Sequence, residues 1–407
     1  MSASNREQLD KRYNEIKARG LSLDMTRGKP CGPQLDLSSG LLDCLGRDFK
    51  AADGTDCRNY GVLDGLPEAK KLFAEFLEVT PAEIIVAGNS SLALMHDSVA
   101  QAVLRGVPGG SQPWHGAKFL CPSPGYDRHF AVCEHLGIEM INVRMTEEGP
   151  DMDEVERLTS GDESIKGIWC VPKYSNPTGV VFSDAVVDRL ARMKAAPDFR
   201  VFWDNAYTVH HLTDRPRPLK NLLSACKEAG NADRVLIFGS TSKVSFAGAG
   251  VAMMAGSEAN VAYTKQNMSL QTIGPDKVNQ LRHVRFFRDM AGIEAHMKKH
   301  AAILKPKFDA VTAILDREIG DSGAATWTRL AGGYFISVDT KDGCAKAVVK
   351  MAAEAGAKLT SAGATFPHGK DPRDRNIRIA PSMPSQAEIE QAMELVAICI
   401  QRVALGS

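Results

Sequence analysis

The 407-residue sequence has no excess of charge of either sign, because 49 Lys and Arg residues balance 49 Asp and Glu residues. A strongly basic surface is what attracts nucleic acid or an anionic membrane, so neither partner is expected. No apolar run approaches the roughly 20 residues that a membrane-spanning helix needs. Residues 4–12 are polar and charged and contain no apolar signal-peptide core. These absences predict a soluble, cytoplasmic protein.

Metal and disulfide chemistry also lack support. The nine cysteines are odd in number and scattered, and no two form a C-x-x-C pair, which favours reduced thiols over a disulfide framework or a zinc site. His296 and His300 have the spacing of a two-histidine metal face on a helix, but no third ligand is apparent and Lys298 and Lys299 lie between them. We expect a solvated helix face there and no metal site.

Several nucleotide-binding and nucleophile motifs are missing. The chain has no Walker A string, and the dinucleotide-like start Gly248-Ala249-Gly250 is followed by Met253 where the motif requires glycine or alanine. Ser240 and Lys243 have the S-x-x-K spacing of penicillin-binding enzymes, but the accompanying S-D-N and K-T-G strings do not occur. Another chemistry must therefore explain this lysine.

Three polar signals each follow their own apolar, strand-like run. Asn176 opens an N-P-T-G string, Asp204 stands three residues before Tyr207, and Lys243 lies in a serine-rich run. Each signal is weak alone, since N-P-T-G is a turn tetrapeptide and an aspartate at a strand end is as often a helix cap. Together they can hold pyridoxal 5′-phosphate (PLP), whose aldehyde needs a lysine amine and whose ring nitrogen needs a carboxylate.

This order and spacing resembles the fold-type-I PLP-dependent aminotransferases, over most of the chain from about Gly28 to Arg378. The resemblance implies that Lys243 binds the cofactor covalently and later carries a proton, for which burial should lower its pKa. Asp204 would keep the ring nitrogen protonated. Asn176 and Tyr207 would donate hydrogen bonds to the phenolic oxygen. Lys243, Asp204 and Tyr207 are thus the predicted catalytic residues.

The resemblance implies further cofactor contacts. Tyr126 would stack on the ring, and His129 would bond to the aspartate. Tyr60 would reach the phosphate of a neighbouring subunit, which predicts a homodimer with shared active sites. The phosphate would be held by a helix N-terminus and hydroxyl groups, from Asn89, Ser90, Ser91, Ser240 and Ser242.

The resemblance also implies substrate contacts. Arg378 would bind the α-carboxylate, for which a planar guanidinium is well shaped. Asn176 and Gly28 would border the substrate. Arg373 and Arg375 lie close to Arg378 in the sequence and are expected to be solvated loop charges.

Two departures from the family pattern concern anion binding. Ala249 stands where an arginine usually binds the phosphate, so another cation or more hydroxyl and amide donors must replace it. Residues 269–275 contain no arginine for the distal carboxylate of a dicarboxylic substrate. Arg27 and Lys29, which flank Gly28, are the predicted replacements, and ordinary surface charge is the alternative.

Apolar runs alternate with amphipathic stretches such as Asp184–Lys194. Such alternation predicts an α/β fold whose mostly parallel sheet is sandwiched by helices and binds ligands at the carboxyl ends of its strands. The family resemblance implies PLP-dependent transferase fold type I, with a large domain and a smaller α/β domain. We expect one long helical stretch from Asp276 to about Leu315, followed by strands near Thr328–Val338 and Asn376–Ala380. The predicted division is an N-terminal segment 1–50 packing with the small domain, a large PLP-binding domain 51–300 and a small C-terminal domain 301–407.

The strings T-R-G-K-P, G-N-S-S-L and I-R-I-A-P-S look most like a divergent bacterial branch of aspartate aminotransferases. The resemblance implies transamination of L-aspartate and 2-oxoglutarate to oxaloacetate and L-glutamate. Transamination of alanine, an aromatic amino acid or 2-aminoadipate, and PLP-dependent β-elimination, are alternatives. An aminotransferase-like transcriptional sensor is a rival of another class. It would need a DNA-binding head, whereas only about 25 residues precede Thr26 and they contain no basic recognition helix.

Overall fold

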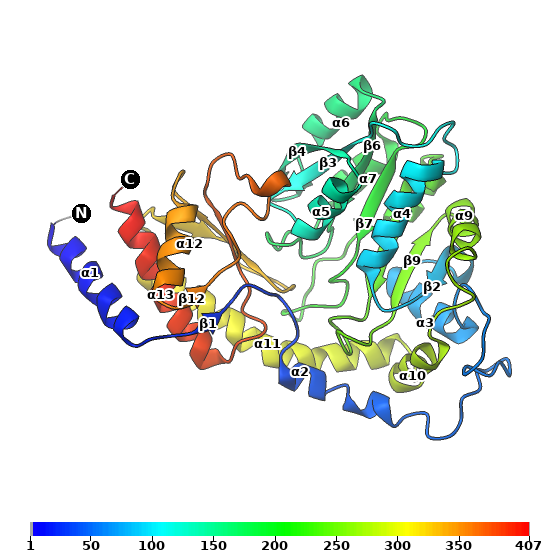
Figure 1. Ribbon diagram of the computed structural model, residues 1–407, viewed down its shortest axis with the longest axis horizontal. Helices are drawn as coiled ribbons and strands as arrows, with labels where there is room; N and C mark the ends of the chain where they lie inside the picture. Colours follow the sequence, from blue (N-terminus) through cyan, green and yellow to red (C-terminus); the bar gives the residue numbers. More distant parts are fainter. Residues whose placement is uncertain (1–2, 407) are drawn as a thin grey trace.

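The computed structural model describes residues 3–406, which form a larger and a smaller unit (Figure 1). The larger unit is built on an eight-stranded sheet with the order β2-β9-β8-β7-β6-β3-β4-β5. Its central strands are parallel, whereas β2, β9 and β5 pair antiparallel with their neighbours. The strands are β2 (Ile84–Val86), β3 (Lys118–Ser123), β4 (Glu139–Thr146), β5 (Gly149–Pro150), β6 (Ile165–Cys170), β7 (Arg200–Asp204), β8 (Val235–Ser240) and β9 (Ala252–Gly256).

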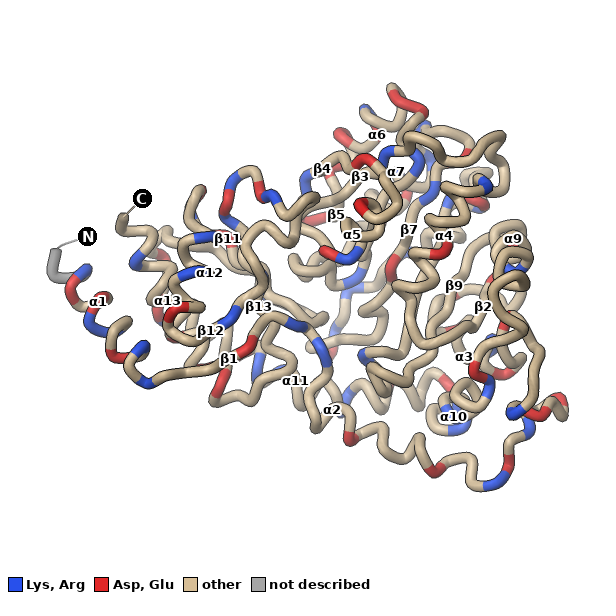
Figure 2. Tube along the Cα trace, viewed as in Figure 1, with Lys and Arg blue, Asp and Glu red and all other residues tan. Residues whose placement is uncertain are grey.

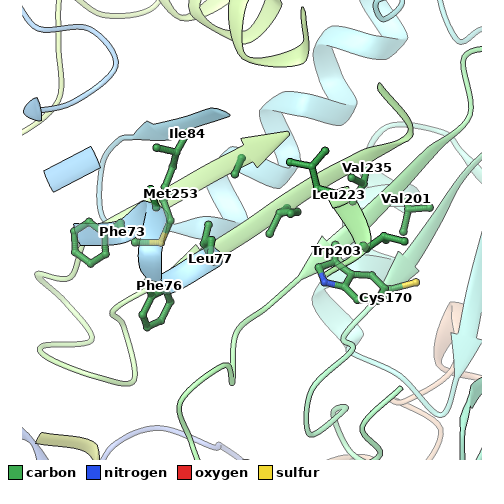
Figure 3. Packing of buried hydrophobic residues seen from close by; sticks show 14 of the residues in the cluster. Phe73, Phe76, Leu77, Ile84, Cys170, Val201, Trp203, Leu223, Val235 and Met253 are labelled. Carbon is green, nitrogen blue, oxygen red and sulfur yellow. The ribbon is translucent and has the colours of Figure 1, made fainter. Parts of the chain in front are cut away.

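Helices cover both faces of this sheet, because side chains alternate between two buried cores along each strand. In β7, Val201 and Trp203 belong to one core and Phe202 to the other, and Figure 3 shows the first core, in which Phe73 and Leu77 of α3 also pack. One face carries α4 (Ser91–Arg105), α5 (Asp127–His135) and α9 (Glu258–Met268). The other carries α3 (Pro67–Leu77), α6 (Met152–Gly161), α7 (Asp184–Arg192), α8 (Leu222–Glu228) and α10 (Lys277–Phe287).

The smaller unit holds the antiparallel sheet β10-β11-β13 and the buried helix α13 (Gln386–Ala404). Helix α11 (Met290–Glu318) runs from the larger unit into it and packs along α13 (Figure 1). Its other elements are β10 (Ala325–Trp327), β11 (Ile336–Thr340), α12 (Ala345–Glu354), β12 (Ala357–Lys358) and β13 (Asn376–Ile379).

The N-terminal segment divides between the two units. Helix α1 (Ala3–Ala18) packs on α13, and β1 (Leu23–Asp24) pairs in parallel with β12. Helix α2 (Gly32–Asp36) instead contacts α11, and the 3-10 turn Ser39–Leu42 contacts α10. We propose domain boundaries at residues 50 and 300.

The predicted fold class is confirmed, and two of its details are wrong. The stretch from Asp276 to about Leu315 forms two helices, because Arg288 has a left-handed φ of 69° and Asp289 caps α11 by accepting a bond from the Gly292 N–H (2.8 Å). The range Thr328–Val338 is not one strand. Its chain turns at Gly333, whose φ of 89° favours glycine, and continues into β11.

Acidic and basic positions are interspersed over both units (Figure 2). None of the helices within residues 3–406 combines the length and the apolar character needed to cross a lipid bilayer.

Candidate active site

The carboxyl ends of β6, β7 and β8 meet at one edge of the sheet, because these strands are parallel neighbours. Asp204 is the last residue of β7, while Asn176 and Lys243 lie in the segments that follow β6 and β8. A cavity of about 530 Å³ opens there, and its walls come from both units. The predicted site residues that line it are Arg27, Gly28, Lys29, Ser91, Tyr126, Asn176, Asp204, Tyr207, Lys243 and Arg378.

The two oxygens of the buried Asp204 carboxylate differ in their hydrogen-bond partners. Nε2 of His129 donates to Oδ2 (3.0 Å), and the His129 ring stacks on Trp169 with its centroid 4.4 Å away. Oδ1 is buried and has no hydrogen-bond partner among the described residues. Buried polar atoms are nearly always paired, so Oδ1 marks a place where a ligand donor fits.

Lys243 lies in a turn after β8, with its Nζ 4.9 Å from the centre of the Tyr207 ring. Burial lowers the pKa of its amine, and the charge of Asp204 opposes this effect in part. Burial also raises the pKa of Tyr207 well above its usual range and that of Tyr126 to about 12. Both phenols therefore stay neutral and can donate hydrogen bonds.

Arg378 reaches the cavity from β13 in the smaller unit. Its Nη1 donates to Oδ1 of Asp127 (2.8 Å) and to Oδ1 of Asn176 (3.3 Å), and its guanidinium carbon lies 4.8 Å from the centre of the Phe335 ring. These contacts hold a nearly buried guanidinium beside the ends of β6 and β7.

Gly28 packs so tightly that a Cβ there would lie 2.4 Å from Cζ of Phe335. The segment around it is tied to the smaller unit, since the hydroxyls of Thr360 and Ser382 donate to the carbonyls of Thr26 and Lys29 (both 2.9 Å). Figure 2 shows basic positions on this segment between β1 and α2.

Ser91 is the first residue of α4 and lines the cavity, whereas Asn89 and Ser90 line a second cavity of about 220 Å³ that the same helix borders. Ser90 caps α4 by accepting from the Ala93 N–H (3.2 Å). The remaining predicted phosphate donors adjoin this loop: Ser240 donates to Ser242 (3.1 Å), which donates to the Asn89 carbonyl (3.4 Å).

Two further positions from the sequence lie outside the cavity. Tyr60 is 85% exposed, on a loop of the larger unit. Ala249 is also exposed, and the amide of Asn279 in α10 donates to its carbonyl (3.0 Å). Near Arg378, Arg373 and Arg375 pair with acidic residues of the smaller unit.

Sequence reasoning missed several residues that line the cavity. Arg128 is exposed there, next to the predicted Tyr126, and its position in the first turn of α5 was the available signal. Thr360 and Ser361 follow the two-residue strand β12, and their sequence carried no signal.

The predicted solvated face at His296 and His300 is wrong, because the two side chains are 6% and 1% exposed. This part of α11 is covered by α2 and by the turn that holds Lys243, since Gln34 contacts His300 and the Val244 carbonyl contacts His296. Within residues 3–406, no group of three or more His, Cys, Asp or Glu side chains is arranged to hold a metal ion.

Comparison with known proteins identifies the family. The family model described as "Aspartate amino-transferase" matches residues 1–406. The chain belongs to the aspartate aminotransferase family. It is 47% identical to the aspartate aminotransferase of Corynebacterium glutamicum over 400 residues, which is 97% of this chain and 92% of that protein.

Solved structures agree with this assignment. A crystal structure of an aspartate transaminase from C. glutamicum has a TM-score of 0.97 and 45% identity, covering all of this chain and 98% of that one. The α-aminoadipate aminotransferase of Thermus thermophilus, solved with N-(5′-phosphopyridoxyl)-L-leucine, has a TM-score of 0.78 and 20% identity over 96% of each chain, and so shares the fold. The chain is an aminotransferase.

Aminotransferases of this fold class typically use PLP, and the residues present fit that cofactor. The unpartnered Oδ1 of Asp204 suits a protonated ring nitrogen. The lowered pKa of Lys243 suits an amine that reacts with an aldehyde. The N-terminus of the 15-residue helix α4, with Ser91, suits a phosphate group.

Buried histidines should make the protein less stable in acid. Burial lowers the pKa of His210 to about 3 and those of His283 and His300 to about 4, whereas an unfolded histidine titrates near about 6.5. Below that value the unfolded chain takes up protons that the folded chain does not, so the free energy of unfolding decreases as the pH decreases. We expect the melting temperature to drop between about pH 7 and about pH 5.

His300→Gln provides the control, because it removes one of these titrating groups. Its melting temperature should depend less steeply on pH over the same interval. A wild-type melting temperature that stays constant or rises on acidification would contradict this account.

Proposed function

We propose that this aminotransferase uses PLP and that L-aspartate and 2-oxoglutarate are its principal substrates. The observation that carries the proposal is the charge of the cavity. Arg378 lines the same cavity as Lys243 and Asp204, and three more cations line this space: Arg27, Lys29 and Arg128. None of these three forms an ion pair with a described residue, so the cavity can accept a second carboxylate. The relatives named as aspartate aminotransferases support the same choice.

When bound, PLP supplies an electron sink for the pair left at the substrate α-carbon and carries the amino group between the two acids. Lys243 would then carry the proton from the substrate α-carbon to C4′ of the cofactor, a role that suits an amine whose pKa is lowered by burial. Asp204 would hold the proton of the ring nitrogen. Asn176 and the neutral phenol of Tyr207 would donate to the phenolic oxygen. Tyr126 would cover the ring, near His129.

The phosphate would lie at the N-terminus of α4, with Asn89, Ser90, Ser91, Ser240 and Ser242 as the neighbouring donors. The Asn279 amide, which donates to the carbonyls of Ala249 and Gly250, supports the loop where family members usually have an arginine. We propose that hydroxyl and backbone N–H donors replace that arginine.

We further propose a homodimer in which Tyr60 reaches the partner's site. Tyr60, Leu270 and Ile273 are 85%, 69% and 63% exposed, and their loops touch, since a Cβ at Gly274 would lie 2.3 Å from the Gly61 carbonyl oxygen. Exposed apolar side chains gathered in one place favour an interface. Sedimentation should give twice the chain mass, and Tyr60→Ala should weaken PLP binding without dissociating the dimer. A monomer with full activity would refute the shared site.

Borohydride reduction of the PLP-loaded protein should attach the cofactor to a single peptide containing Lys243. The reason is that this amine lies in the cavity, next to Asp204, with a pKa lowered by burial. Mass spectrometry of the digested protein locates the label. A label on any other lysine would overturn the assignment of Lys243.

Asp204→Asn is the matched variant for this experiment. It keeps the side-chain volume and should leave the label at Lys243. Turnover should fall by several orders of magnitude, because a neutral amide stabilises the protonated ring nitrogen poorly. Near-normal turnover would mean that another carboxylate does this work.

Substrate selectivity should show which cation of the cavity binds the distal carboxylate of aspartate. Neutralising the residue that binds the distal carboxylate, by Arg27→Gln, Lys29→Gln or Arg128→Gln, should reduce kcat/KM for aspartate at least tenfold, about 1.4 kcal/mol. The same variant should leave alanine unaffected, since alanine has no distal carboxylate. Half-reactions with a panel of amino donors, followed by the cofactor's absorbance, measure this difference.

Arg378→Ala is the control, because it should impair aspartate and alanine alike, by about 3–5 kcal/mol for loss of a desolvated charge partner. If all three glutamine variants and their combination keep the wild-type preference for aspartate over alanine, the cavity cations do not select the substrate. If the panel shows that alanine, an aromatic amino acid or 2-aminoadipate is preferred, that amino acid replaces aspartate as the proposed donor.

A further inference from the structure

Three buried histidines contact the turn that carries Lys243, and none of them lines the substrate cavity. Nε2 of His210 lies 3.1 Å from the Lys243 carbonyl oxygen, and Nε2 of His296 lies 2.9 Å from the Val244 carbonyl oxygen. Nε2 of His283 lies 2.8 Å from Oγ of Ser245. The histidines come from the segment after β7, from α11 and from α10, so three separate elements meet at this turn.

Two carbonyls of the turn, those of Lys243 and Val244, depend on side chains for their hydrogen bonds. Among the described residues, no backbone N–H donates to the carbonyl of Lys243 or of Val244. Within the turn, the N–H groups of Val244 and Ser245 donate to the Thr241 carbonyl (both 2.8 Å). His210 and His296 therefore supply donors that regular secondary structure supplies elsewhere.

The partners of each ring fix where its proton lies. A carbonyl oxygen only accepts, so Nε2 of His210 and of His296 must carry the hydrogen. In His283, Nδ1 donates to the Asn279 carbonyl (2.8 Å), which leaves Nε2 to accept from Ser245. Nδ1 of His210 is buried without a partner, so a second proton there would have no acceptor. Burial lowers the pKa of all three histidines, in agreement with neutral rings.

A second layer connects this turn to the N-terminal segment. Nε2 of His300 lies 3.1 Å from Nε2 of His296, and Nδ1 of His300 lies 3.0 Å from Nε2 of Gln34. The Cys31 N–H donates to Oε1 of Gln34 (3.1 Å), which sets the orientation of the amide. Nε2 of Gln34 also donates to the Tyr334 hydroxyl (2.9 Å), which lies 3.5 Å from the Lys243 carbonyl oxygen.

A purely structural role would require only that these side chains fill space. Their arrangement does more, because the contacts converge on two consecutive carbonyls, one of them belonging to Lys243 itself. The first of these carbonyls belongs to a peptide unit attached to the Lys243 Cα, and the second belongs to the next unit, so a shift of this backbone would displace the Lys243 side chain relative to Asp204. Such a displacement is what misaligns a group that must transfer a proton.

We propose that His210, His283 and His296 are positioning residues of the transamination, which clamp the turn Thr241–Ser245 and thereby aim the Lys243 amine. The His300 ring packs against the His296 ring, with centroids 4.8 Å apart, and Gln34 contacts His300 from the other side. The inference rests on the proposed role of Lys243 in the reaction. The clamp itself is a property of the protein without cofactor and can be measured there.

The test compares two substitutions of His296. His296→Leu fills the space but removes the donor, whereas the amide of His296→Gln can still donate to the Val244 carbonyl. In the protein without cofactor, His296→Leu should increase deuterium uptake in peptides covering residues 241–251, and His296→Gln should restore protection. In the PLP-loaded protein, His296→Leu should shift the pH midpoint of the cofactor's absorbance change. It should also lower kcat on the order of 100-fold with little change in KM, because Arg378 is untouched.

Leu304→Ala is the matched control. Leu304 lies on the same helix, 2% exposed, in the core of the smaller unit. It should lower the melting temperature at least as much as His296→Leu while leaving both deuterium uptake at 241–251 and the absorbance midpoint at wild-type values. Equal changes in the control, or wild-type behaviour of His296→Leu in both measurements, would overturn the clamp.

A second pair keeps the test decisive if His296→Leu does not fold. His210→Leu removes the donor to the Lys243 carbonyl and His210→Gln can keep it, so the same loss and rescue are expected. Failure of the proposed function has a different signature: borohydride would label a lysine other than Lys243 in the wild-type protein. Deuterium uptake without cofactor would still report on the clamp in that case.

Discussion

The buried carboxylate of Asp204 is the constraint on which the site depends. Removing a charge from water costs several kcal/mol unless partners replace the solvent. His129, stacked on Trp169, satisfies one oxygen and leaves the other for a cationic ligand. The same charge reaches its neighbours: it opposes the lowering of the Lys243 pKa and adds to the raised pKa values of Tyr126 and Tyr207. One carboxylate thus helps to set the protonation of an amine and two phenols.

The orientation of the Lys243 side chain depends on contacts of a different kind. Asp204 is held by its own strand, whose backbone bonds to β8 through regular pairing. Lys243 lies beyond the end of β8, in a turn where no backbone N–H of the described residues donates to the carbonyls of Lys243 and Val244. Side chains must replace the missing ladder, and His210 and His296 do so from elements distant in the sequence. Lys243, for which we propose a role in proton transfer, is therefore held by side-chain contacts to its turn and not by strand pairing.

This contrast explains which features the sequence could predict. The meeting of Asn176, Asp204 and Lys243 follows from strand order, because neighbouring parallel strands end at one edge. The burial of His296 and His300 does not follow, since it depends on Gln34 and Val244, which lie far away in the sequence. The lysines between the two histidines suggested that this face of the helix is exposed to solvent, yet helical spacing places those lysines on another face. The break at Arg288 was hidden for a similar reason, because one left-handed residue interrupts an otherwise continuous apolar pattern.

The cavity cations differ in the unit that carries them, and this bears on how a dicarboxylate would be bound. Arg27 and Lys29 lie on a segment tied to the smaller unit by β12, Thr360 and Ser382, as Arg378 is by its own strand. Arg128 belongs to α5 of the larger unit. A substrate held by Arg378 and the N-terminal cations would have both carboxylates on one unit. A substrate held by Arg378 and Arg128 would bridge the two units. Protection of the unit boundary on adding substrate therefore distinguishes these two ways of binding aspartate.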